Sequence, residues 1–175
     1  MKNRIKSLAK EVTDLYVKPL RRQIHKYPEL SFVEYETSNL IQNLLDEWEI
    51  ENEPVNITGI VANIKGRNPE KRTIALRADM DALPIQETND CDYKSVKRNV
   101  MHACGHDGHM AILLELARRL DRKEQLPNNV LLIFQPAEES PGGAKIICDT
   151  GVLEEHKITA VFGAHLWPTL EKGVV

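Results

Sequence analysis

Cysteine is scarce in this chain, and both long apolar runs and extended stretches of one charge are missing from it. The three cysteines, Cys91, Cys104 and Cys148, are odd in number, so they cannot all pair in disulfides. No apolar run approaches the roughly 20 residues that a membrane-spanning helix needs. The basic N-terminus lacks the apolar stretch of about 7–15 residues that a secretory signal contains. We therefore expect a cytoplasmic protein without a membrane partner.

The charge balance offers no basic surface to nucleic acid. The 175 residues include 23 Lys and Arg and 26 Asp and Glu, spread along the chain, for a net charge of −3. No repeat, low-complexity tract or clear linker divides the sequence, and its 42% hydrophobic content suffices for one globular core. We expect a single domain that does not bind nucleic acid.

Hydrophobic spacing predicts an α/β fold. Apolar residues at helical spacing predict four helices, at residues 5–16, about 33–48, 106–120 and about 144–150. Short segments rich in apolar or β-branched residues predict four strands, at residues 58–66, 72–79, 129–136 and 158–165. The last two are nearly continuous apolar runs, which are typical of strands buried on both faces of a largely parallel sheet. The prediction is a mostly parallel or mixed sheet flanked by helices.

The middle of the chain concentrates side chains that bind metals. The stretch MHACGHDGH, residues 101–109, holds three of the six histidines and one of the three cysteines. Predicted strands also run out into further possible ligands: Asp79 and Asp81, Glu138 and Glu139, and His165. Because ligands bind at the carboxyl ends of strands in open α/β sheets, we expect these groups to converge on one site.

The cluster suits a divalent metal and hydrolysis. Cys104 and His106 are two residues apart, and in an extended loop this spacing points both side chains to the same side. A thiolate beside imidazole and carboxylate favours zinc, and the many oxygen ligands leave manganese open. The side chains of Glu138 and Glu139 are adjacent and should diverge. One could bind metal while the other acts as the general base on a metal-bound water.

Other conspicuous residues have simpler interpretations. We expect Cys148 to be a small buried hydrophobic residue, Cys91 to be incidental, and His25 and His156 to lie on the surface. We expect Asp107 to be no more than an acidic residue in the first turn of the helix, where the helix dipole stabilises negative charge.

The roles of His102 and His109 stay open. Each could hydrogen-bond to a metal ligand and orient it, face a substrate, or pack at the N-terminus of the predicted helix.

Five ordered stretches carry a family resemblance: HKYPELSFVEYETS, TIALRADMDALPIQE, VMHACGHDGHMA, LIFQPAEESPGGAKIICDTGVL and FGAHLWPTLEKGVV. They resemble the aminoacylase and hippurate hydrolase family of metallopeptidases. More narrowly, they are similar to its amidohydrolase branch, with hippurate hydrolase, N-acetyldiaminopimelate deacetylase and the indole-acetyl-amino-acid hydrolases. The resemblance covers nearly the whole chain from about His25 onward, and it implies a zinc-peptidase-like catalytic domain.

The resemblance implies a role for each candidate residue. Cys104, His106, Glu139 and His165 would be metal ligands, and Glu138 would be the general base. The implied reaction is hydrolysis of the amide bond of an N-acyl amino acid or small peptide with two divalent ions, zinc or manganese.

One motif departs from the wider family. That family has a His-x-Asp motif where this chain has Asp79-Met80-Asp81. Its histidine ligand is therefore absent here, and Asp81 is expected to support the ligands rather than to bind metal.

The end of the sequence sets a further expectation. Members of the family continue into a lid and dimerisation domain and then return to complete the sheet. Residues 1–175 would therefore be the N-terminal portion of a catalytic domain, without turnover of its own. The final GVV should present an unpaired sheet edge that invites a homo-oligomer or a complementary fragment.

Two other readings stay open. A truncated remnant could bind metal or a partner chain without catalysis. A cysteine protease with Cys104 as nucleophile is weaker, because it leaves Glu138, Glu139 and His165 without roles.

Overall fold

The computed structural model describes residues 13–68, 70, 72–122 and 126–171. Five strands form one sheet in the order β1-β2-β4-β3-β5. Their bounds are β1 Glu51–Val55, β2 Gly59–Ile64, β3 Thr73–Asp79, β4 Asn129–Gln135 and β5 Ile158–Gly163. β3 runs parallel to both β4 and β5, whereas β2 is antiparallel to β1 and β4. The expected mostly parallel or mixed sheet is confirmed as a mixed one.

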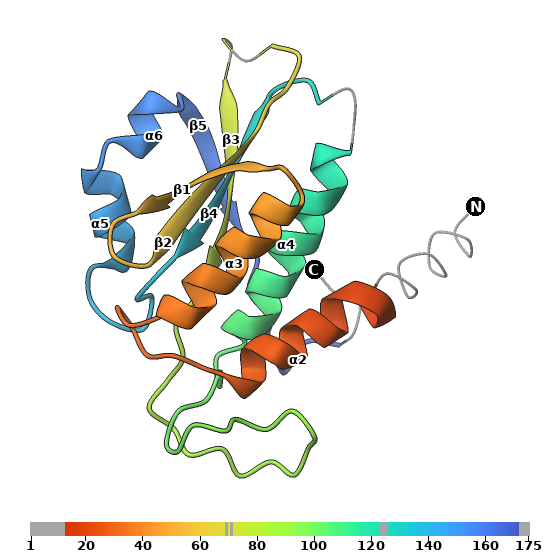
Figure 1. The fold of residues 1–175 in the computed structure, drawn as a ribbon. Coiled ribbons are helices and arrows are strands. Elements are labelled where there is room, and N and C mark those ends of the chain that lie inside the picture. Colours follow the sequence, from red (N-terminus) through yellow and green to blue (C-terminus); the bar gives the residue numbers. More distant parts are fainter. Residues whose placement is uncertain (1–12, 69, 71, 123–125, 172–175) are drawn as a thin grey trace.

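Helices cover both faces of this sheet (Figure 1). A short π-helix, Thr13–Val17, leads into α2, Lys18–Lys26, with Pro19 in its first turn. The remaining helices are α3 Tyr35–Glu47, α4 His106–Asp121, α5 Gly143–Asp149 and α6 Val152–Glu155. None of the helices in these described ranges combines the length and apolar character of a membrane span.

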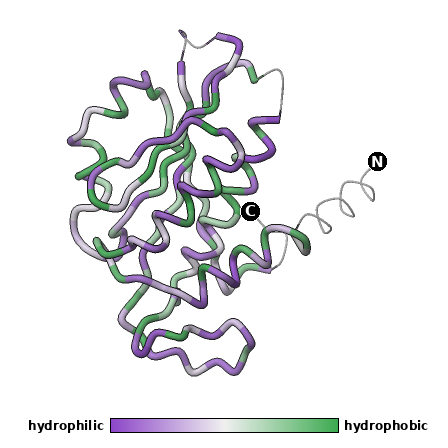
Figure 2. Tube along the Cα trace, viewed as in Figure 1, coloured by the Kyte–Doolittle hydropathy of each residue, from purple (hydrophilic) through white to green (hydrophobic). Residues whose placement is uncertain are grey.

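The hydrophobic core has two parts, one on each face. On one face, α2, α3 and α4 pack their apolar side chains, among them Ile41, Leu45 and Leu114, against alternate residues of β2 and β4. On the other face, Ile147 of α5 and Val152 of α6 cover a smaller cluster. In Figure 2 the central strands of the sheet are largely hydrophobic, and the outer part of the long loop between β3 and α4 is largely hydrophilic.

The structure differs from the predicted elements at two strands, and two further predictions fall outside the described residues. Most of the predicted helix at residues 5–16 lies outside the described residues, and the predicted edge at 173–175 lies there too. Strand β1 was not predicted, because Glu51–Val55 is polar and contains Pro54, which an edge strand tolerates. β5 is not buried on both faces. It pairs with β3 on one side, no described strand covers its other edge, and Val161 and Phe162 are more than half exposed.

Two expectations about single residues are wrong as well. His25 is buried rather than on the surface. Cys148 is exposed rather than buried, because it lies on the outer side of the short helix α5.

Candidate metal centre

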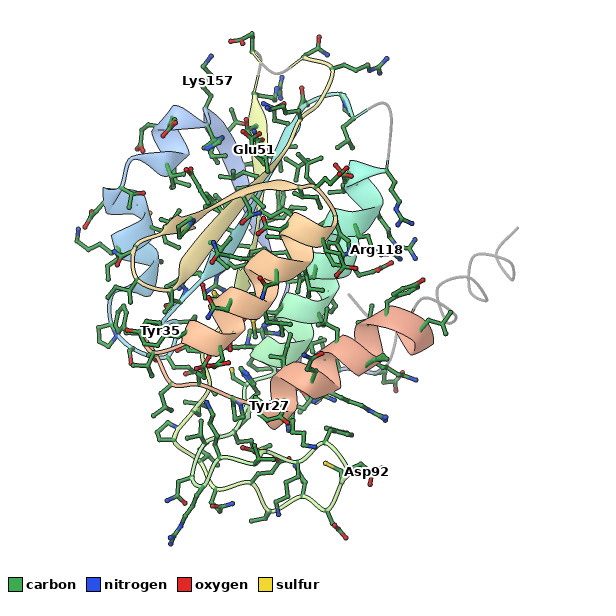
Figure 3. All side chains as sticks on the ribbon, in the orientation of Figure 1. Tyr27, Tyr35, Glu51, Asp92, Arg118 and Lys157 are labelled. Carbon is green, nitrogen blue, oxygen red and sulfur yellow. The ribbon has the colours of Figure 1, made fainter. Side chains whose placement is uncertain are left out.

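The candidate ligands meet at one end of the sheet. β3 and β4 are parallel neighbours, and so are β3 and β5. The residues that follow these three strands therefore lie at the same end of the sheet. The long loop after β3 returns at this end to begin α4 (Figure 1). Asp92, an acidic residue of that loop, is exposed and points away from the sheet (Figure 3).

His106 occupies the centre of the cluster. Gly105 precedes it with φ of +90°, a left-handed conformation that glycine adopts freely, and thereby turns the chain from the loop into α4. The His106 side chain is fully buried, and its Nδ1–H donates to the backbone oxygen of Asp81 over 2.8 Å. This bond leaves Nε2 facing the cluster, where it has no hydrogen-bond partner among the described residues.

Carboxylates surround this nitrogen. His106 Nε2 lies 3.6 Å from Asp79 Oδ2, 3.8 Å from Glu138 Oε2 and 3.8 Å from Glu139 Oε1. Asp81 and Asp79 outweigh the effect of burial and raise the pKa of His106. These carboxylates therefore favour the protonated, cationic form of the imidazole.

Cys104 and His165 form a second side of the cluster. Cys104 Sγ lies 3.4 Å from His165 Nε2. The other ring nitrogen of His165, Nδ1, donates to the backbone oxygen of Leu166 over 2.8 Å, so Nε2 is left with its lone pair toward the sulfur. Burial, followed by the nearby carboxylates of Glu139, Glu138 and Asp79, raises the pKa of the Cys104 thiol to about 11.

Asp81 supports the cluster through hydrogen bonds. Its carboxylate accepts the backbone N–H groups of Glu138 and Glu139 over 2.9 and 3.0 Å and the hydroxyl of Ser31 over 2.6 Å. Burial opposes ionisation, but hydrogen bonds from His106, Ser31 and these two amides outweigh it and lower the pKa of Asp81 to about 2. Asp81 therefore accepts hydrogen bonds as a carboxylate.

His109 is committed to other contacts. Its Nδ1–H donates to Asp79 Oδ1 over 2.6 Å, and its Nε2 accepts the backbone N–H of Leu166 over 2.9 Å. Both ring nitrogens are thus used, although Asp79, His106 and His109 lie close enough together to enclose an ion. His109 instead ties Asp79 to the segment that carries His165.

A buried network next to the cluster was missed by the sequence analysis. His25 is held between two carboxylates, with Nδ1 2.8 Å from Asp107 Oδ2 and Nε2 3.1 Å from Glu87 Oε1. Arg21, one turn earlier on α2, also donates to Asp107 over 2.6 Å. Asp107 is fully buried and does more than favour the helix dipole. The available signal was the first family-like stretch, which begins at His25.

His102 lies beside this network. It is buried, and neither of its ring nitrogens has a hydrogen-bond partner within the described part of the chain. Burial lowers the pKa of His102 to about 4, so the ring is neutral at physiological pH.

The donor set fits a divalent metal ion. One atom from each of Cys104, His106 and His165 lies within 4.8 Å of the others, and the same holds for His106, Glu138 and Glu139. Thiolate, imidazole and carboxylate are the ligands of zinc and similar ions, and His106, whose Nε2 is unpartnered, belongs to both groups. The structure thus brings together every residue that the sequence analysis singled out as a ligand or base.

Comparison with known sequences agrees with the resemblance to metallopeptidases. Residues 75–175 match the sequence model of peptidase family M20/M25/M40. A protein from Staphylococcus epidermidis, named an uncharacterized hydrolase, is 46% identical over 158 residues. The match covers 89% of this chain and 41% of that protein, so the chain spans about two fifths of the relative's length.

Solved structures with a similar fold include the Bacillus subtilis YXEP protein, described as a dinuclear metal binding peptidase from the M20 family. The two structures superpose with a TM-score of 0.83 and are 44% identical in sequence. The match covers 88% of this chain and 43% of the Bacillus subtilis chain. Aminobenzoyl-glutamate utilization protein from Klebsiella pneumoniae has a TM-score of 0.71 and 24% identity, covering 93% and 46%. The second similarity is one of fold alone.

Proposed function

The chain belongs to peptidase family M20/M25/M40, and we propose that it is the catalytic portion of a metal-dependent amidohydrolase that cleaves N-acyl amino acids or small peptides. The observation that carries this proposal is the buried, unpartnered Nε2 of His106, directed at two glutamates and close to a thiol. A buried polar atom without a partner is costly, and a metal ion would satisfy it.

We propose that Cys104, His106, Glu139 and His165 hold two divalent ions, zinc or manganese. When bound, such ions polarise an amide carbonyl and lower the pKa of a water molecule to near neutrality. The assignment of Glu139 is supported by its burial, because its side chain is 24% exposed and that of Glu138 is 41% exposed. The more buried carboxylate suits a ligand, and the more accessible one suits a group that meets substrate.

Glu138 is then the general base. Its carboxylate lies 3.8 Å from His106 Nε2, within reach of a water molecule held beside that nitrogen. It would accept the proton of the attacking water and deliver it to the departing amine. Asp81 fixes the backbone of both glutamates, and His109 holds Asp79 and the His165 segment in place.

All three cysteines are free, which supports a reducing compartment such as the cytoplasm. It also removes disulfide bonding as a competing role for Cys104.

A metal-binding chain without turnover is the alternative. The observation in its favour is the open side of the centre, where His165 is exposed and Trp167 is 61% exposed. Hydrolysis benefits from a site that excludes water and positions the substrate. Release of amino acid from N-acetyl or N-benzoyl substrates at roughly 1–10³ per second would decide for catalysis by this chain itself.

Paired variants of the two glutamates test the proposal. Glu139→Gln should lose metal, because an amide is a poorer ligand than a carboxylate. Glu138→Gln should retain it, and in an active enzyme it should lower turnover about 10²–10⁴-fold. The measurement is metal content after reconstitution with Zn²⁺ or Mn²⁺ and removal of excess ion. Equal metal content in wild type and both variants would contradict the assignment.

A further inference from the structure

Three consecutive backbone amides at the end of β4 each donate to a buried carboxylate. Glu138 N–H and Glu139 N–H go to Asp81, as described above, and Ala137 N–H goes to Glu34 Oε1 over 2.9 Å. Glu34 is 103 positions away in the sequence, in the turn that precedes α3. No helix or strand ladder includes these amides, so the two carboxylates hold this turn in place.

The turn needs such support because its conformation is unfavourable. Ala137 has φ of +51°, in the left-handed region that costs a residue with a Cβ of the order of 1 kcal/mol. The following helix also approaches it closely, since a Cβ at Gly143 would collide with the carbonyl oxygens of Pro136 and Ala137. Without a partner for its N–H, Ala137 could relax to a more common backbone conformation.

Glu34 is itself fixed in position. Its side chain is fully buried, and its second oxygen, Oε2, accepts the hydroxyl of Thr58 over 2.6 Å. Thr58 immediately precedes β2, so Glu34 connects the turn before α3, the start of β2 and the end of β4. A buried carboxylate persists only with such partners.

We infer that Glu34 is a positioning residue for the glutamate pair. It acts through the Ala137 amide, which sets the orientation of the peptide that leads into Glu138. The side chains of Glu138 and Glu139 can point in different directions for different roles only if the orientation of the backbone between them is fixed. This inference rests on the proposed function, in which Glu139 binds metal and Glu138 acts as base.

Three variants separate positioning from general stability. Glu34→Leu removes both acceptors at similar volume. Thr58→Val removes only the contact with Thr58 and leaves the Ala137 bond. Glu34→Gln can keep both contacts, because its amide oxygen accepts from Ala137 and its NH₂ donates to the Thr58 hydroxyl oxygen.

The readout is Zn²⁺ affinity in competition with a chromophoric chelator, together with the unfolding midpoint of the metal-free protein. We expect Glu34→Leu to bind Zn²⁺ roughly tenfold or more weakly, as loss of a supporting hydrogen bond does at metal sites. Thr58→Val should lose stability but keep wild-type affinity, and Glu34→Gln should keep both. Wild-type affinity in a folded Glu34→Leu variant would overturn the inference. Failure of the wild type to bind Zn²⁺ would instead contradict the metal centre.

Amide hydrogen exchange of the wild type tests the same bond if Glu34→Leu does not fold. The amide of Ala137 should exchange as slowly as the amides inside β4, although it lies outside the sheet. Exchange at the rate of an exposed loop would show that Glu34 does not hold this amide, and would overturn the inference.

Discussion

The Nδ1–H of His106 donates to the backbone oxygen of Asp81 over 2.8 Å, so that Nε2 is the atom that faces the cluster. A backbone carbonyl can only accept, which fixes the tautomer when the ring is neutral. The opposite nitrogen is left buried, without a partner in the described structure, and among carboxylates. Under the proposed function, this arrangement would orient a metal ligand before any metal binds.

Zinc binding should release a proton from Cys104. The thiol is protonated in the metal-free protein at neutral pH, since burial raises its pKa to about 11, and a metal binds the thiolate. Calorimetric titration at pH 7 in buffers of different ionisation enthalpy should show about one proton fewer released by Cys104→Ser than by wild type. Cys148→Ser, at an exposed cysteine, is the matched control and should leave proton release unchanged. Equal release from all three proteins would exclude Cys104 as a ligand.

The stability contributed by His25 should fall as pH rises. The hydrogen bond to Asp107, followed by that to Glu87, raises the pKa of His25 in the folded protein above its ordinary value of 6.5, despite burial. The contribution is therefore complete below about pH 6.5 and is lost as the pH passes the raised folded pKa.

Denaturant unfolding of the metal-free protein across this range measures the effect. The difference in free energy of unfolding between wild type and His25→Gln should shrink at high pH. His156 lies outside this network, at the end of α6, and His156→Gln serves as the comparison variant for loss of a histidine. A difference for His25→Gln that stays constant with pH would contradict a charged His25.

The exposed strand β5 should promote self-association. Val161 is 53% exposed and Phe162 58% exposed, on a strand whose outer edge no described strand covers. Such an edge pairs readily with another chain. Phe162→Lys should shift sedimentation toward the monomer, whereas Val96→Lys, at a similarly exposed loop residue, should not. A wild type that stays monomeric at high concentration would show that this edge does not pair.

The sequence predicted the elements that position the site. Helix α4 and strands β3 and β4 follow strong apolar patterns, and their bounds agree with prediction to within one or two residues. The convergence of the ligands follows from the parallel pairing of β3 with β4 and β5, since parallel strands end on the same edge. The family resemblance of the sequence is confirmed by the match over residues 75–175.

The features that were missed depend on contacts between distant residues. The burial of His25 requires Asp107, 82 positions later, to supply a charged partner. Ala137, in its left-handed conformation, donates its N–H to the carboxylate of Glu34, 103 positions earlier. Neither pairing leaves a periodic pattern, so local spacing predicts a surface histidine and gives no sign of the bond between Glu34 and Ala137.

X-ray absorption at the zinc edge of the reconstituted protein tests the central claim most directly. The account predicts a sulfur scatterer at about 2.3 Å together with nitrogen or oxygen scatterers at about 2.0–2.1 Å. The sulfur signal should disappear in Cys104→Ser and persist in Cys148→Ser. A zinc ion surrounded only by nitrogen and oxygen in the wild type, or no retained zinc at all, would contradict a metal centre built on Cys104 and His106.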